Sequence, residues 1–195
     1  MSQVEAPLEG SQPLPLEALV RLSLVVVVSL VLQLSLLDGV RVAGAHPDLL
    51  VLLPVAVGLL AGPDRGASVG FVVGLVTDLV LPTPFGLSAL VGTLLGAAAG
   101  SLRPGRARPS LWMAVPLVAA GAAAGTVLRG VLLALFGVPK ALTAYLPPAL
   151  VVVTVGGLVL GPLVLRAVRW ALPVEEPARP GPGLGGSAAP GRVRT

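Results

Sequence analysis

The sequence predicts an all-α integral membrane protein, a six-transmembrane-helix bundle with short loops. Two observations predict this class. Of 195 residues, 55% are hydrophobic and only 11% are charged, and the mean hydropathy of +0.95 is far above that of soluble domains. The apolar residues also gather in six spans separated by charges or by Pro and Gly, at roughly 20–37, 47–61, 66–81, 86–102, 111–136 and 144–166.

The same pattern divides the chain into three parts. Residues 1–19 are predicted to be a flexible cytoplasmic tail, 20–170 the six-span membrane domain, and 171–195 a disordered cytoplasmic tail rich in Pro, Gly and Ala. The apolar run from Leu22 to Leu37 is longer than the core of a usual signal peptide. We therefore expect the first span to be retained as an anchor.

The second and third spans are the shortest and the hardest to interpret. Each has about 15 residues, whereas about 20 are needed to cross a bilayer. Between them Gly62-Pro63-Asp64-Arg65-Gly66 predicts a very tight turn. A pair of full crossings and a partly re-entrant pair both remain open.

The distribution of basic residues favours cytoplasmic termini in the bacterial inner membrane. With the N-terminus inside, the external loops hold only Arg41 and Lys140. The cytoplasmic segments then hold eight arginines, which are Arg21, Arg65, Arg103, Arg106, Arg108, Arg166, Arg169 and Arg179. The basic loop of Arg103, Arg106 and Arg108 suits anionic headgroups or an acidic protein surface, although topology alone would also produce it.

Composition argues against several classes of chemistry. The chain has no cysteine and one histidine, so neither a metal site nor a thiolate nucleophile is expected. No Ser/His/Asp set, paired carboxylates or phosphate-binding loop is recognisable, and we expect no cofactor and no catalysis. Aromatic residues make up only 3% of the chain, which leaves no stacking platform for nucleic acid.

Glycines recur at intervals of four along most spans and predict close helix packing. In lipid, small residues at this spacing allow backbones to approach, which replaces the hydrophobic drive for association. The repeats include Gly70 and Gly74 in the third span, and beyond it Gly92, Gly96, Gly100, Gly121, Gly125, Gly157 and Gly161.

Two of these glycine series end in a charge, at Asp78 and at Arg129. Four residues advance a helix by about 400°, so each charge stays near the face that packs against protein. Both lie near the outer end of their spans. A buried Arg–carboxylate pair there would offset the free-energy cost of placing each charge inside the membrane. Two alternatives stay open: Asp78 caps the turn at Thr83 while Arg129 reaches the headgroups, or a partner protein supplies the polar contact.

The region 47–100 resembles the bacterial rod-shape-determining MreD family. The matching residues are Pro47-Asp48-Leu49-Leu50, Gly70-Phe71-Val72-Val73-Gly74-Leu75-Val76-Thr77-Asp78-Leu79, and Phe85-Gly86-Leu87-Ser88-Ala89-Leu90. The resemblance implies a non-catalytic membrane scaffold of the cell-elongation machinery, acting in cell shape and peptidoglycan synthesis. It also implies binding to an MreC-type scaffold and, indirectly, to MreB filaments, a RodA-type glycosyltransferase and an elongation transpeptidase.

A second class of protein has the same size, number of spans and Ala/Gly-rich helices as this chain. It is the substrate-binding membrane subunit of an energy-coupling-factor vitamin transporter. Such a subunit should enclose a pocket with several convergent polar or aromatic groups. Within the spans Gln33, Asp78 and Arg129 are the main polar side chains, which favours the scaffold.

Overall fold

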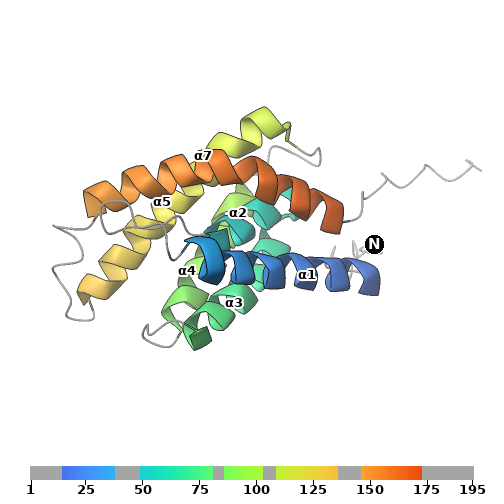
Figure 1. Ribbon diagram of the computed structural model, residues 1–195, viewed down its shortest axis with the longest axis horizontal. Coiled ribbons are helices and arrows are strands. Elements are labelled where there is room, and N and C mark those ends of the chain that lie inside the picture. Colours follow the sequence, from blue (N-terminus) through green and yellow to red (C-terminus); the bar gives the residue numbers. More distant parts are fainter. Residues whose placement is uncertain (1–14, 38–48, 81–85, 103–108, 136–145, 173–195) are drawn as a thin grey trace, which may run out of the picture.

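The computed structural model describes residues 15–37, 49–80, 86–102, 109–135 and 146–172, and the elements in these ranges are helical (Figure 1). They are α1 (Leu16–Leu32), which continues into a π-helical turn η1 (Gln33–Leu37), α2 (Leu49–Ala61), α3 (Pro63–Val80), α4 (Leu87–Ser101), α5 (Leu111–Leu135) and α7 (Leu146–Ala171). Each helix coincides with one of the apolar spans expected from the sequence. The bounds differ by a few residues, most at α7, which ends at Ala171 rather than near residue 166, and at α1, which begins at Leu16 rather than near residue 20.

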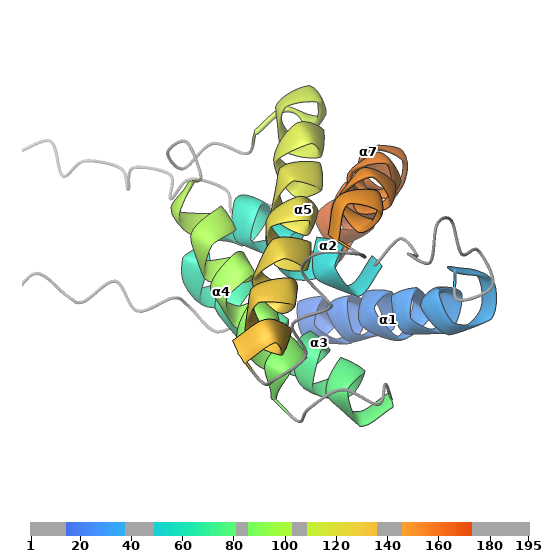
Figure 2. The same ribbon diagram turned by 90° about the vertical axis from the view of Figure 1, so that its left-hand side faces the viewer.

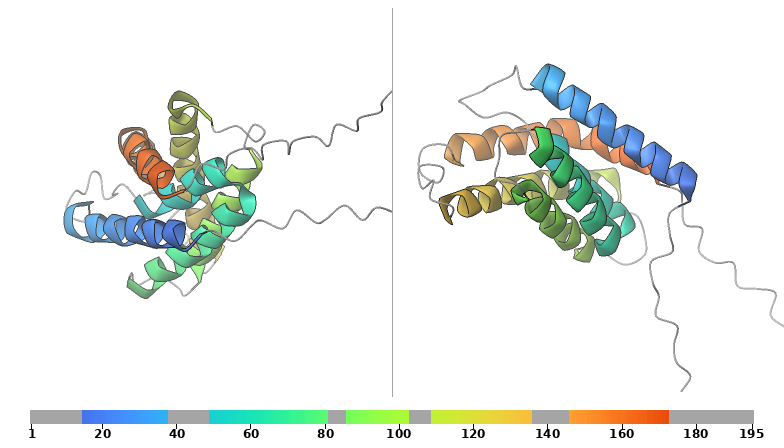
Figure 3. Two further views of the ribbon diagram at one scale, coloured as in Figure 1. Left: turned by 90° about the vertical axis from the view of Figure 1, so that its right-hand side faces the viewer. Right: turned by 90° about the horizontal axis from the view of Figure 1, so that it is seen from below.

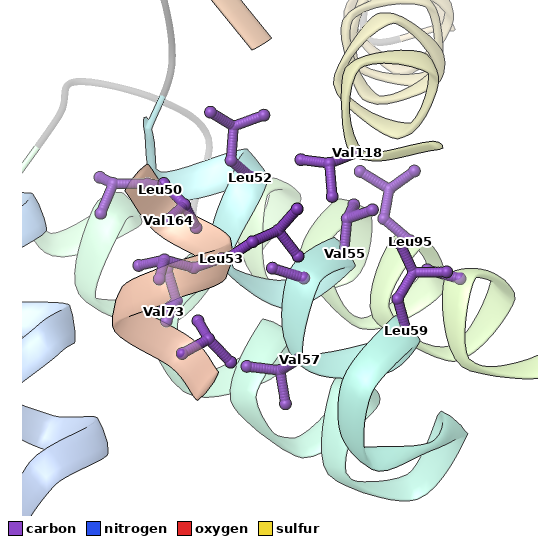
Figure 4. Packing of buried hydrophobic residues seen from close by; sticks show 14 of the residues in the cluster. Leu50, Leu52, Leu53, Val55, Val57, Leu59, Val73, Leu95, Val118 and Val164 are labelled. Atoms are coloured by element: carbon purple, nitrogen blue, oxygen red, sulfur yellow. The ribbon is translucent and has the colours of Figure 1, made fainter. Parts of the chain in front are cut away.

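Helix α2 lies at the centre of the molecule. It contacts α3 and α4 on one side and α5 and α7 on the other, with α1 touching it as well (Figure 2). Eleven of its 13 residues are buried, because it is apolar all round. Leu53, Val55 and Val57 point into the core that these helices share (Figure 4).

The turn between α2 and α3 is shorter than the sequence suggested. Only Gly62 separates the two helices, with φ of +97°, a conformation that glycine adopts without strain. Pro63 then opens α3, where its missing N–H costs nothing. Asp64, Arg65 and Gly66, which were expected in the turn, belong to the first part of α3.

Helices α3 and α4 pack backbone to backbone through glycine. A Cβ added at Gly92 would lie 3.0 Å from the carbonyl carbon of Gly70, and one added at Gly96 would lie 3.0 Å from the backbone nitrogen of Ala67. We call this contact between α3 and α4 the glycine seam. Gly58 of α2 also reaches it, where its added Cβ would lie 2.9 Å from the backbone nitrogen of Gly100. Three helices thus meet at a separation that only glycine permits.

The remaining glycines of the predicted packing repeats are less constrained. Added Cβ atoms at Gly121 and Gly125 would meet the ends of side chains, Val55 and Leu95 respectively, each at 2.7 Å. At Gly157 the nearest atom would be the Cα of Ala119 at 3.0 Å. At Gly161 every neighbour would lie at 3.8 Å or beyond, so glycine is not required there.

Large apolar side chains cover the outside of the bundle as well as its core. Val20, Leu79, Val151 and Val159 are among many that are more than half exposed. A surface of this kind is stable against lipid and not against water. Within the described residues, three stretches are long and apolar enough to cross a membrane, at Leu16–Ser35, Leu111–Leu135 and Pro147–Ala171.

The other three helices are shorter or more polar than an ordinary span. Helix α2 has 13 residues and α4 has 15, or about 20 and 22 Å of axis, against a hydrocarbon core of about 30 Å. Helix α3 has 18 residues but carries Asp64, Arg65 and Asp78. The structure therefore gives three long apolar spans, and the count of six crossings stays a prediction.

Apart from Asp78 and Arg129, the charged residues of the described segments gather at one end of the bundle. Arg21 of α1 stacks on Trp170 of α7, the start of α5 accepts a hydrogen bond from Arg169, and Pro63 of α3 approaches Gly100 of α4. These contacts place the α1, α3 and α5 N-termini beside the α4 and α7 C-termini. We call this the basic end, defined by Arg21, Arg65, Arg166 and Arg169.

Candidate functional site

The side chain of Asp78, near the C-terminal end of α3, holds the beginning of α4. Its carboxylate accepts hydrogen bonds from the backbone N–H groups of Gly86 (3.0 Å), Ser88 (3.1 Å) and Ala89 (3.2 Å). The residue is only 3% exposed. The first N–H groups of a helix have no partner within the helix, and the helix dipole favours a negative charge at that end. Asp78 therefore satisfies a buried helix terminus that water would otherwise have to reach.

Glycine at position 86 is required by this turn. Gly86 precedes α4 with φ of +90°, and it offers no side chain to cap the helix. The capping group comes instead from Asp78, eight residues earlier in the chain. Gly86 of the sequence motif Phe85-Gly86-Leu87 thus contacts Asp78, whereas Phe85 lies outside the described residues.

Arg129 of α5 reaches the same helix terminus. Its Nη2 donates a hydrogen bond of 2.7 Å to the hydroxyl oxygen of Ser88, whose backbone N–H is donated to Asp78. Asp78 and Arg129, the two charges expected to point inward at one depth, therefore contact the same residue. A direct ion pair between them stays a prediction. Ser88 belongs to the segment that resembles the MreD family, but no role was predicted for it; its place in the first turn of α4 is the signal that could have shown one.

Ser88 and Arg129 border a narrow crevice between α2, α3, α4 and α5. Its lining includes Leu50, Pro54, Thr77, Gly92 and Arg129, and it is mostly apolar, with room for about one water molecule. The Thr77 hydroxyl donates to the carbonyl of Val73 within its own helix. This crevice could hold a bridging water and is far too small for a vitamin.

A second buried polar side chain holds the beginning of α2. Gln33, 6% exposed, lies where α1 turns into η1, and its Oε1 accepts a hydrogen bond of 2.9 Å from the backbone N–H of Leu49. Gln33, one of the few polar side chains within the spans, thus bonds from the end of one helix to the start of the next. The N-terminal caps of α2 and α4 thus both come from other helices.

Several residues named from the sequence lie outside the described parts of the chain. They are Pro47 and Asp48 before α2, the Thr83 capping alternative, and the basic loop of Arg103, Arg106 and Arg108. Among the residues that the structure does describe, no group of three or more His, Cys, Asp or Glu could hold a metal ion.

The fold and this site define a class of protein: a helical membrane protein in which a buried and a half-buried charge cap and join helices. Comparison with protein families gives a more specific result. The model of the rod shape-determining protein MreD matches residues 16–124, more than half of the chain, and this chain belongs to the MreD family. No curated protein and no solved structure matches it.

The matched region covers α1 to α4 and the first half of α5. It includes Gln33, the glycine seam and the Asp78 cap, but it ends five residues before Arg129. The family assigns the chain to cell-shape determination in rod-shaped bacteria. This agrees with the resemblance found from residues 47–100.

Proposed function

We propose that this protein is a non-catalytic membrane adaptor of the bacterial cell-elongation machinery. Membership of the MreD family carries the proposal. The chemistry of the site supports it, because the described contacts of Asp78, Ser88 and Arg129 join α3, α4 and α5 to one another. A scaffold needs a rigid membrane body, and these contacts supply rigidity.

The partner that the family implies is an MreC-type scaffold protein. Through it the adaptor would connect to MreB filaments, a RodA-type glycosyltransferase and an elongation transpeptidase. The apolar outer faces of α3 and α4, where Phe71, Leu75 and Leu90 are exposed, suit contact with lipid or with a partner's membrane helix.

Depletion of the protein in a rod-shaped host is the direct test of this function. We expect cells to lose their rod shape and become round, and the full-length chain supplied from a plasmid to restore it. Affinity purification in mild detergent should recover the MreC-type partner. Cells that keep their shape but lose uptake of one vitamin would contradict the adaptor function and support a transporter subunit.

We also propose a topology of six crossings with both termini in the cytoplasm of the inner membrane. The basic end defined above supports this orientation, since arginine is retained on the cytoplasmic side. A reporter that works only in the cytoplasm should be active when it is fused after residue 106. A reporter that works only in the periplasm should be active when it is fused at residue 140. A periplasmic signal at residue 106 would reverse the orientation.

A further inference from the structure

The outer surface where α1 meets α7 combines basic and aromatic side chains at the basic end. The two helices converge there (Figure 3), and the guanidinium of Arg21 lies 5.5 Å from the centroid of the Trp170 ring. Arg166 is exposed and lies one turn before Trp170, so the two share a face of α7. Trp170 itself is 57% exposed.

Apolar side chains continue from this cluster toward the middle of the bundle. On α1, Leu24 and Val28 follow Arg21 at intervals of three and four residues, and both are about half exposed. On α7, Leu163 and Val159 precede Arg166 at the same intervals and are more exposed still. Each helix thus carries a basic group at its end and an apolar strip that extends about 10 Å from it.

We propose that this surface, Arg21, Arg166 and Trp170 with their apolar strips, binds an anionic phospholipid. The guanidinium groups contact the lipid phosphate, Trp170 lies at the level of the headgroup, and the acyl chains lie along the two strips. The arrangement of basic groups beside apolar strips matches the polarity of a phospholipid. Free phosphate would not use the apolar part.

The other charges near this surface affect how strongly it prefers an anionic over a neutral phospholipid. Glu17 lies 3.4 Å from Arg21 and offsets part of its charge. Arg169, on the same turn of α7, donates from Nη2 to the backbone carbonyl of Pro109 and so faces α5. Two guanidinium groups and one carboxylate therefore face the lipid, and the surface has a net positive charge.

Quenching of Trp170 by brominated lipids tests the proposal in the full-length protein. The Trp112→Phe variant leaves Trp170 as the single tryptophan, and Trp112 is 91% exposed, so its replacement disturbs little packing. The protein is reconstituted in vesicles of phosphatidylcholine with a minor fraction of phosphatidylglycerol, and either lipid carries the bromine. We expect phosphatidylglycerol to be enriched about fivefold beside Trp170 relative to its bulk fraction.

Variants then assign the effect to the named residues. Arg21→Gln with Arg166→Gln should reduce the enrichment to the bulk value, and Glu17→Gln should increase it. Arg65→Gln removes the same charge from the same end, but on α3, and should leave the enrichment unchanged. Helix content by circular dichroism shows that each variant is folded. Quenching of the Trp112→Phe variant by brominated phosphatidylglycerol that only matches the bulk fraction of this lipid, or the same loss in Arg65→Gln, would overturn the proposal.

Discussion

Replacement of Gly96 by alanine is expected to destabilise the folded protein by about 3 kcal/mol, although one methyl group is added. Alanine normally stabilises a helix relative to glycine by about 0.5–1 kcal/mol. At Gly96 the new Cβ would overlap the backbone of Gly66 and Ala67 in α3. A side chain can rotate away from such an overlap, but a backbone cannot, so α3 and α4 must separate along their length.

The matched control for this change is Gly161→Ala in α7. Gly161 is also buried and helical, and its added Cβ would meet neighbours only at ordinary contact distance. We expect this variant to unfold at the same denaturant concentration as the parent, or slightly above it. Unfolding in mixed micelles of mild detergent and dodecyl sulfate, followed by circular dichroism, measures both. Equal stability of the two variants would show that the seam between α3 and α4 is looser than described.

Replacement of Asp78 by asparagine is expected to cost on the order of 3 kcal/mol. The carboxylate accepts three backbone hydrogen bonds in a buried site. The asparagine amide keeps one oxygen and places two N–H donors against donors of α4. The uncompensated charge of Arg129 then remains beside Ser88. The control is Asp64→Asn in the same helix. It removes the same charge, but from an exposed side chain, and should change the stability little.

A double-mutant cycle with Arg129→Gln tests the predicted coupling between the two charges. Each single variant leaves the other charge without its predicted counter-charge, Asp78 in a buried site and Arg129 in a half-buried one. Breaking a fully buried pair costs about 3–5 kcal/mol, which is an upper bound here. The double variant should therefore recover part of the loss. The measured quantities are the free energy of unfolding and the amount of MreC-type partner that co-purifies. Strictly additive losses would exclude coupling and leave Asp78 as a helix cap alone.

Some features of this protein follow from the sequence by local rules. The positions of the helices could be predicted because apolar runs interrupted by Pro, Gly or charge have few alternatives in lipid. The inward direction of Asp78 could be predicted from its register with Gly70 and Gly74, since residues four apart share a helix face. The family resemblance rested on the same segment and is confirmed by the family match.

Other features depended on contacts between segments far apart in the chain. The sequence showed a glycine every fourth residue on several helices, but the fold decides which of them meet backbone, as Gly96 does, and which meet open packing, as Gly161 does. It gave no sign that α2 would be enclosed on all sides, because a short apolar run is compatible with both lipid and protein surroundings.

The clearest difference concerns the caps of α2 and α4. Local rules look for a capping side chain next to the helix, whereas here Gln33 and Asp78 reach the N–H groups from other helices. Sequence determined that these two polar side chains must be satisfied inside an apolar bundle. Only the tertiary structure decided their partners, because hydrogen bonds require atoms within about 3 Å and that proximity is set by packing.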